Sequence, residues 1–491
     1  MPEGSESSSK EWVLEPETEY RFELDPGTSL AIKLLRGNAE IFGAEMVEGK
    51  PYLFGSECKA AIFTWVGCTL QMSYTFIDIE TRPYFWFPEH VIGQPSTEYV
   101  SEETPMAVYG NLHIALEQMR VRALAKHRGS PEPEGRPSSD LLAEPPRVLV
   151  LGPDNAGKTT LCKTLINYAG AWAAPGAISA TSVYSPLPTC SPSSPLGSAA
   201  TSAPTSLGSN ALLPLVYWYG HSSTTRNPLL MDRLIRNLGV NVDDKFSNDP
   251  KGQTAGLIVD TPSSFASGTA VNNEQRQKLI KACVDAFKIN IILVVGHEKL
   301  NVEMQRTYGS SLKVVKVPKS GGVVELDHGY RERVRNRQIH TYMYGEVIPP
   351  PLGISGGTQG GEATTDLTLA PSSTAINFGD LNIYRVGAAT MAPSSALPIG
   401  ASRSVSEMQP VLIDPSIPGS GLLNAILAVL APFNPDENER YDEEILDLAV
   451  IGFIAVTHID VAHKKFTVLS PTQGSLVGKT AVIGSYEWQE L

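Results

Sequence analysis

The sequence predicts a multi-domain α/β protein, and three observations support this prediction. The 491 residues exceed what one hydrophobic core usually serves, so we expect about three domains. The first part of the chain alternates apolar and polar residues between turn signals, whereas the middle part alternates apolar runs with helical stretches. We divide the chain into an N-terminal β domain at 1–110, a helix and linker at 111–146, a central α/β domain at 147–345, and a C-terminal β-rich domain at 346–491.

The composition excludes several classes of protein. With 42% hydrophobic and 19% charged residues, the chain is globular and not a disordered tail. Its five cysteines form no CxxC pair, which favours a reducing compartment and excludes a metal centre built from cysteine. The longest apolar stretch is about half as long as a bilayer span requires. A net charge of −13 argues against wholesale binding to nucleic-acid backbone, so we expect an intracellular soluble protein.

The N-terminal region is expected to be a small all-β unit. Residues 20–24 and 30–32 alternate apolar and polar side chains on either side of a turn at 25–27. An aromatic-rich segment at 74–95 interrupts this pattern, and we treat it as an insertion of undefined conformation. Apolar residues at helical spacing then predict a helix from Asn111 to near His127, followed by a linker.

The central region has the pattern of a parallel sheet whose strands are covered on both faces. An uncharged tract runs from Thr164 to Thr225 and contains a Ser/Pro-rich segment at 185–214, which we predict to be a disordered surface loop. A Gly/Thr-rich stretch at 353–368 separates this region from the C-terminal one. The predicted strands are 148–151, 257–259, 291–295 and 314–317 in the central region, and 381–386, 450–457 and 466–469 in the C-terminal region.

The strongest chemical signal is a phosphate-binding loop at 152–159, which fits the pattern GxxxxGK[ST]. It follows a predicted strand and precedes a helical stretch, so the backbone N–H groups of the loop and the helix N-terminus would form a cradle for phosphates. Lys158 would reach the β and γ oxygens, and Thr159 would hold Mg²⁺. An ordinary strand-to-helix turn is the alternative, and this context disfavours it.

Phosphoryl transfer needs more than a phosphate loop, because a carboxylate must organise Mg²⁺ and a base must position the nucleophile. No acidic residue lies between Asp154 and Asp232, so the usual second strand of the fold contributes none. Asp260 is the remaining candidate, since it ends an apolar run as the acid of a Walker B strand does. The alternative is that Asp260 caps the segment that begins beside Pro262.

A basic cluster follows the last predicted central strand. It would contact phosphates of a nucleotide or RNA, or it is a solvated helix face. At helical spacing Arg331 shares a face with Arg335, as Arg333 does with Arg337, so two of these side chains could converge on one site. The cluster comprises Lys313, Lys316, Lys319, Arg331, Arg333, Arg335 and Arg337.

Several blocks of the sequence resemble the eukaryotic family of polyribonucleotide 5′-hydroxyl kinases and pre-mRNA cleavage-factor subunits, which includes cleavage factor IA in fungi. The Ser/Pro-rich insertion suggests a fungal member. Besides the phosphate loop, the blocks are 37–45 (GNAEIFGAE), 60–65 (AAIFTW), 104–106 (TPM), 115–120 (ALEQMR), 317–325 (VPKSGGVVE) and 466–471 (FTVLSP).

The resemblance implies an N-terminal β-sandwich, a central P-loop kinase-like domain and a C-terminal mixed α/β domain, with ATP and Mg²⁺ held between the first two. It further implies a nuclear location, other 3′-end processing factors, and as nearest partner the scaffold subunit that binds the polymerase C-terminal domain. Glu19 and Lys59, which the residues alone would place as surface charges at strand ends, match family contacts to the nucleotide. The phosphate-loop contacts that carry over are Asn155, Ala156, Gly157, Lys158, Thr159 and Thr160.

Three departures from the family pattern bear on activity. Active members carry an Asp-x-Gly-Gln-like strand after the P-loop helix, and here residues 169–175 occupy that region, so we interpret the strand as deleted. Their Thr-x-Gly-Trp base clasp is replaced by Thr261-Pro-Ser-Ser followed by Phe265. Among the lid arginines, Arg331 and Arg335 match, whereas Gln338 and His340 stand where animal members have arginine.

These features favour an ATP-binding structural subunit of the pre-mRNA 3′-end cleavage and polyadenylation machinery without efficient catalysis. The alternative is an active ATP-dependent RNA 5′-hydroxyl kinase, with Asp260 as base or Mg²⁺ ligand and Arg331 and Arg335 in its lid. A GTPase-like switch, suggested by residues 260–262 alone, lacks a guanine-specifying motif and is ranked last.

Overall fold

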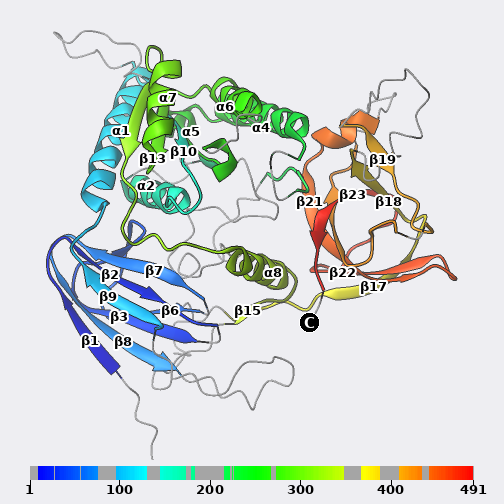
Figure 1. Cartoon of the computed structure of the whole chain (residues 1–491), viewed down its shortest axis with the longest axis horizontal. Coiled ribbons are helices and arrows are strands. Elements are labelled where there is room, and N and C mark those ends of the chain that lie inside the picture. The colour runs from blue at the N-terminus through cyan, green and yellow to red at the C-terminus, as the bar shows by residue number, and fades with distance from the viewer. Residues whose placement is uncertain are drawn as a thin grey trace, which may run out of the picture.

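The chain forms three bodies, seen in Figure 1 as blue N-terminal sheets, a cyan-to-green α/β centre and a yellow-to-red C-terminal sheet. The predicted insertion 74–95 lies outside the described residues except at its two ends, and the predicted loop 185–214 lies wholly outside them. The computed structural model describes residues 9–26, 28–55, 57–75, 95–129, 144–172, 179–182, 215–221, 224, 226–266, 273–347, 366–387, 408–417, 419–433 and 442–489.

The N-terminal body is a β-sandwich of two antiparallel sheets. One sheet has the order β1-β8-β3-β6 and the other β5-β4-β7-β2-β9. Alternate residues of the strands, such as Tyr20 and Phe22, fill the space between the sheets, because successive side chains of a strand point to opposite faces. The strands are β1 (Ser9–Leu14), β2 (Thr18–Glu23), β3 (Ser29–Gly37), β4 (Glu40–Ile41), β5 (Ala44–Glu45), β6 (Pro51–Phe54), β7 (Lys59–Thr64), β8 (Cys68–Thr75) and β9 (Thr97–Ser101).

Helix α1 (Met106–His127) connects the sandwich to the central body. It begins five residues before the predicted start at Asn111, so the predicted start was wrong. Gly110 lies inside the helix and interrupts the helical pattern of the sequence. The ring of Trp65 explains this glycine, because a Cβ at position 110 would meet that ring at 3.3 Å.

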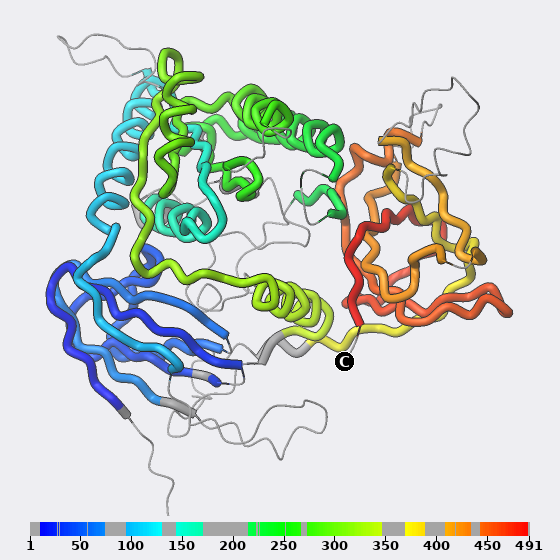
Figure 2. The backbone as a smooth tube through the Cα atoms, viewed as in Figure 1, coloured from blue at the N-terminus to red at the C-terminus, as the bar shows by residue number. Residues whose placement is uncertain are grey.

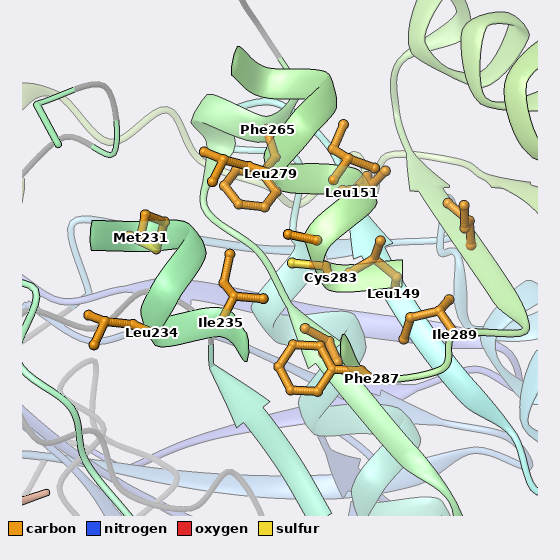
Figure 3. Close-up of a cluster of buried hydrophobic side chains, with 14 of the residues drawn as sticks. Leu149, Leu151, Met231, Leu234, Ile235, Phe265, Leu279, Cys283, Phe287 and Ile289 are labelled. Atoms are coloured by element: carbon orange, nitrogen blue, oxygen red, sulfur yellow. The ribbon is translucent and has the colours of Figure 1, made fainter. Parts of the chain in front are cut away.

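The central body is a five-stranded parallel sheet with the order β11-β12-β10-β13-β14, and the four strands predicted here are confirmed. Along β10, Val148 and Val150 face α1 and α2, whereas Leu149 and Leu151 face α4 and α6. Figure 3 shows this second cluster, with Phe265 and Phe287 in it. The elements are β10 (Arg147–Leu151), α2 (Lys158–Trp172), β11 (Ser179–Ser182), α4 (Pro228–Asn248), α5 (Pro250–Ala255), β12 (Leu257–Asp260), the 3₁₀ helix η3 (Ser263–Phe265), α6 (Asn273–Ala286), β13 (Ile291–Val295), α7 (Glu298–Tyr308), β14 (Lys313–Val317) and α8 (His328–Tyr344).

The second strand of this sheet is present, so the interpretation that it is deleted was wrong. Strand β11 pairs in parallel with β12, with Ser182 opposite Asp260. Its sequence, Ser-Ala-Thr-Ser, lacks the apolar run that marks a buried strand, and it occupies an edge where one neighbour suffices. It supplies no acidic residue, as the sequence indicated.

The C-terminal body is a mixed sheet with the order β17-β22-β21-β20-β23-β18-β19, in which β18 and β23 are parallel. The three strands predicted in this region are confirmed. The elements are β15 (Gly345–Val347), β16 (Asp366–Thr368), β17 (Ser372–Asn377), β18 (Leu381–Val386), β19 (Pro410–Leu412), β20 (Ala425–Leu430), the 3₁₀ helix η6 (Asp442–Asp447), β21 (Val450–Asp460), β22 (Lys465–Ser470) and β23 (Lys479–Glu487).

Helix α8 lies between the N-terminal sandwich and the C-terminal sheet, as the tube in Figure 2 shows. Near its C-terminal end, Ile339 and Met343 are buried in the apolar cluster of the C-terminal sheet. There the hydroxyl oxygen of Tyr342 accepts a hydrogen bond from the Phe453 backbone N–H at 3.0 Å. Within the described ranges, none of the helices combines the length and apolar character needed to cross a bilayer.

Candidate functional site

The phosphate loop joins the carboxyl end of β10 to the first turn of α2, as the sequence predicts. Asn155 and Gly157 have φ values of +53° and +85°, in the left-handed region. A Cβ at Gly157 would meet a methyl carbon of Val323 at 3.0 Å, so the loop is closely covered by the segment that follows β14. A loop of this shape before a helix N-terminus presents free backbone N–H groups to an anion.

Lys158 lies against the loop. Its ammonium donates hydrogen bonds to the carbonyl oxygens of Gly152 at 2.9 Å and Pro153 at 2.8 Å. Burial lowers the pKa of Lys158, while the carboxylates of Asp260 and Asp154 oppose that shift. The Lys158 ammonium therefore lies at the loop where phosphate oxygens would enter.

Asp260 meets Thr159 at the edge of the sheet. Strands β10 and β12 are parallel with Val150 opposite Asp260, so their carboxyl ends lie side by side. The Thr159 hydroxyl donates to Asp260 Oδ2 at 2.6 Å. The capping alternative is not supported, because the N-cap of the following 3₁₀ helix is Pro262.

This pair of side chains fits a magnesium ion. Asp260 Oδ1 is buried and has no hydrogen-bond partner among the described residues. Burial raises the pKa of Asp260, while the Thr159 hydroxyl and the Lys158 ammonium hold it down. A hydroxyl and a carboxylate with one open oxygen are ligands that Mg²⁺ prefers, with water completing the shell.

Of the two predicted lid arginines, Arg331 reaches the phosphate loop. Its Nη2 donates to Asn155 Oδ1 at 2.7 Å and lies 3.4 Å from Asp154 Oδ1. Arg335 instead lies over the ring of Tyr486 in the C-terminal sheet, 5.5 Å from the ring centroid. The basic cluster is thus divided between different surroundings and does not act as one patch.

The two residues predicted from the N-terminal domain lie on neighbouring strands. Glu19 is buried on β2, not exposed at a strand end, where it pairs with Arg21 and accepts from the Thr104 hydroxyl at 3.2 Å. Lys59 begins β7, pairs with Glu23 and lies over the ring of Tyr330 of α8 at 5.4 Å. Lys59 therefore adjoins α8, whose Arg331 contacts the phosphate loop, whereas the described hydrogen bonds of Glu19 reach neither α8 nor the loop.

Sequence reasoning missed Arg21 and Glu57. The Arg21 guanidinium packs on Gly322, where an added Cβ would lie 2.6 Å from Nε, and it links Glu19 to the segment that covers Gly157. The glycine pair 321–322 was the available signal, because adjacent glycines mark a close approach. Glu57 pairs with Arg333 of α8, a contact that has no local sequence signal.

Phe265 does not provide a platform for stacking a nucleic-acid base. Its side chain is fully buried in the cluster that covers one face of the central sheet (Figure 3). Thr261, the first residue of the degenerate clasp, donates its hydroxyl hydrogen to the carbonyl of Val150 at 2.6 Å. The side chains of Phe265 and Thr261 are therefore part of the core of the central body.

Three family models match the chain, one in each body. Residues 13–123 match the N-terminal β-sandwich domain of polyadenylation factor, residues 152–345 match the mRNA cleavage and polyadenylation factor CLP1 P-loop, and residues 369–490 match pre-mRNA cleavage complex II protein Clp1. Together they span most of the sequence.

Curated relatives match the chain along its whole length. An mRNA cleavage and polyadenylation factor CLP1 from Laccaria bicolor is 66% identical, with 100% of each chain covered. The protein of that name from Mycosarcoma maydis is 31% identical, covering 97% of this chain and 98% of the relative. The polyribonucleotide 5′-hydroxyl-kinase Clp1 of Rattus norvegicus is 30% identical, with 100% of each covered.

Two solved structures share the fold. A wild-type Clp1p–Pcf11p complex superposes with a TM-score of 0.70 at 22% identity, over 99% of both chains. A second structure, which describes an extended interface between Pcf11p and Clp1p and the loss of ATP in a Gly135Arg point mutant, has a TM-score of 0.71 at 21% identity, over 99% of this chain and 100% of that one.

Proposed function

This chain belongs to the CLP1 family of mRNA cleavage and polyadenylation factors, and we propose that it is an ATP-binding structural subunit of the nuclear machinery that cleaves and polyadenylates pre-mRNA. The observation that carries the proposal is the phosphate loop with Thr159 and Asp260 paired beside it, while strand β11, next to Asp260, carries no acidic residue. The ligand stabilises the assembled protein by mass action, and no turnover is required.

Different residues of the chain contact different parts of the nucleotide. Lys158, Arg331 and the backbone N–H groups of 155–160 hold the phosphates, and Thr159 with Asp260 holds Mg²⁺. Glu19 and Lys59 contribute from the N-terminal sandwich. Bound Mg²⁺·ATP would supply the negative charge that Lys158, Arg331 and Lys59 complement and the cation that Asp260 complements.

The same residues are poorly equipped for phosphoryl transfer. A general base and stabilisation of the migrating phosphoryl group are both needed. The chain from 155 to 231 contains no acidic residue, and β11 supplies none at the position beside Asp260. Arg331 contacts the phosphate loop, whereas Arg335 contacts Tyr486. One of the two predicted lid arginines therefore lies where it can stabilise charge on a phosphoryl group.

We further propose that the partner is the scaffold subunit of the cleavage factor that binds the polymerase C-terminal domain, together with other 3′-end processing factors. The names of the two solved structures support this choice, because each describes Clp1p with Pcf11p. Contact with RNA is then indirect, through the assembled machinery.

An active RNA 5′-hydroxyl kinase is the second candidate, and the name of the rat relative favours it. Asp260 is the residue that would have to act as base or Mg²⁺ ligand, and its unpartnered Oδ1 is compatible with either role. The test is transfer of the labelled γ-phosphate of ATP to RNA with a 5′-hydroxyl end in the presence of Mg²⁺. An active kinase labels the RNA, whereas a structural subunit leaves labelling of the RNA at background.

The test is to purify the protein without added nucleotide, denature it with heat and identify the released nucleotide by chromatography. We expect intact ATP close to one per chain from the wild type and none from Lys158→Ala. Lys278→Ala is the control, since Lys278 pairs with Glu274 on the exposed surface of α6, and it retains ATP. Release of ADP, or of no nucleotide from the wild type, contradicts the proposal.

A further inference from the structure

The N-terminal part of α8 contacts the N-terminal sandwich at Glu57, in the turn between β6 and β7, and at Lys59, which lies over the ring of Tyr330. Arg333 Nε donates to Glu57 Oε1 at 2.8 Å, and the Tyr330 hydroxyl donates to the Glu57 carbonyl oxygen at 3.0 Å. Both the side chain and the main chain of Glu57 therefore accept hydrogen bonds from α8. The Glu57 side chain is 10% exposed and that of Arg333 is 57% exposed.

The backbone of Glu57 has an unusual conformation at this contact. Its φ is +60°, in the region that glycine favours and that other residues enter at a cost. Its backbone N–H donates to the carbonyl of Asp25 at 3.4 Å, which ties the turn to the loop between β2 and β3. The main chain of Glu57 is thus linked both to α8 and to the loop between β2 and β3.

The opposite side of the same helix reaches the phosphate loop. Arg331, two residues before Arg333, donates to Asn155 Oδ1 at 2.7 Å. Because residues two apart on a helix point in nearly opposite directions, the first turns of α8 lie between the sandwich and the loop. The carboxylate of Asp327, which accepts from the Tyr330 backbone N–H at 2.6 Å, fixes where the helix begins.

We propose that Glu57 and Arg333 form a latch, meaning an ion pair that holds α8 in the position where Arg331 contacts the phosphate loop. The two are positioning residues, since neither touches the loop itself. By this means the N-terminal sandwich sets the rate at which nucleotide leaves the site. The inference rests on the proposed nucleotide binding, and it adds the element that controls release.

The first measurement is the dissociation rate of a fluorescent N-methylanthraniloyl ATP analogue, chased with excess unlabelled ATP. We expect Arg333→Gln to speed release about three- to fivefold, the effect of losing a half-exposed ion pair. Arg333→Lys, which keeps the charge, restores a rate close to that of the wild type. The matched control is Arg233→Gln, which breaks another ion pair between bodies, with Asp447 of η6, and leaves the rate unchanged.

The second measurement is hydrogen exchange of residues 328–337 in nucleotide-free protein, which reports the latch without any ligand. Arg333→Gln and Glu57→Gln are expected to speed exchange in this segment, and Arg233→Gln is not. If release and exchange in Arg333→Gln both equal those of the wild type, the latch is overturned. If the wild type fails to bind the analogue, nucleotide binding is overturned, and the exchange data still decide whether Glu57 holds α8.

Discussion

Two of the contacts between the N-terminal sandwich and the central body differ in chemistry. The latch joins the sandwich to α8 through a half-exposed ion pair. The second contact, which we name the α2 contact, consists of Glu40, Phe42 and Gly43 of the sandwich against Thr164, Asn167 and Tyr168 of the P-loop helix.

The α2 contact is buried and closely fitted. The Tyr168 hydroxyl donates to the carboxylate of Glu40, which is 6% exposed, and Asn167 Nδ2 donates to the carbonyl of Phe42 at 2.9 Å. Gly43 lies so close to the helix that a Cβ would meet the Thr164 carbonyl oxygen at 2.8 Å. Separating the two surfaces replaces these hydrogen bonds with bonds to water, at a net cost of about 1 kcal/mol each, and also gives up the close packing at Gly43.

The difference in burial indicates that the two contacts have different structural roles. The α2 contact fixes the sandwich on the helix that carries the phosphate loop. The latch is weaker, since an ion pair whose arginine is 57% exposed is screened by solvent and contributes about 1 kcal/mol or less. Opening of the nucleotide site is therefore expected at α8, with the α2 contact as the fixed side.

The largest expected effect comes from breaking the α2 contact at Gly43. Gly43→Val places a branched side chain at φ +81° and against a backbone oxygen, and we expect a loss of about 4 kcal/mol from strain and overpacking together. The measurement is the midpoint of the first thermal transition.

Gly49→Val separates these two causes. Gly49 has φ +79° but no atom within 4 Å of an added Cβ, so this variant has the backbone strain without the clash. We expect it to lose about 1–2 kcal/mol. Equal midpoints for the two variants would show that the fit against α2 contributes nothing.

The sequence predicts the centre of the site but not the contacts that surround it. Thr159 and Asp260 each follow a buried apolar run, and parallel strands bring such ends to one edge. Glu57 and Arg333, by contrast, are 276 residues apart, and no local pattern links them. Strand β11 was missed for another reason, since four small residues at a sheet edge carry no apolar signal.

The next prediction concerns the charge of Glu40. Burial raises the pKa of Glu40 to about 7, although hydrogen bonds from Tyr168 and Trp65 lower it. The folded protein then binds a proton that the unfolded chain has released between pH of about 4.5 and about 7, so stability falls as pH rises through this window. The full shift corresponds to about 3 kcal/mol at most.

Glu40→Gln removes this dependence. We expect the variant to match the wild type at pH 5 and to be more stable at pH 8, as measured by thermal midpoints across that range. The other titratable groups described beside the contact include Tyr168, Glu45, His113 and Lys163, and they remain in both proteins. Glu11→Gln is the control, since Glu11 is an exposed glutamate of β1 in the other sheet of the sandwich, and its midpoints should run parallel to those of the wild type. Parallel curves for Glu40→Gln as well would mean that Glu40 stays ionised throughout.

The smallest expected effect tests the latch by salt. Screening weakens exposed ion pairs and leaves buried hydrogen bonds almost unchanged, so the two contacts should respond differently. Between about 0.05 M and about 0.5 M sodium chloride we expect nucleotide release from the wild type to speed up about twofold. Salt screens the phosphate contacts of Lys158 and Arg331 in both the wild type and Arg333→Gln. The informative quantity is therefore the difference between the two proteins in how steeply the release rate rises with salt. We expect the rise to be shallower in Arg333→Gln, which has no latch to screen. The same salt dependence in both proteins would place control of release at the phosphate contacts alone and leave the latch no role in it.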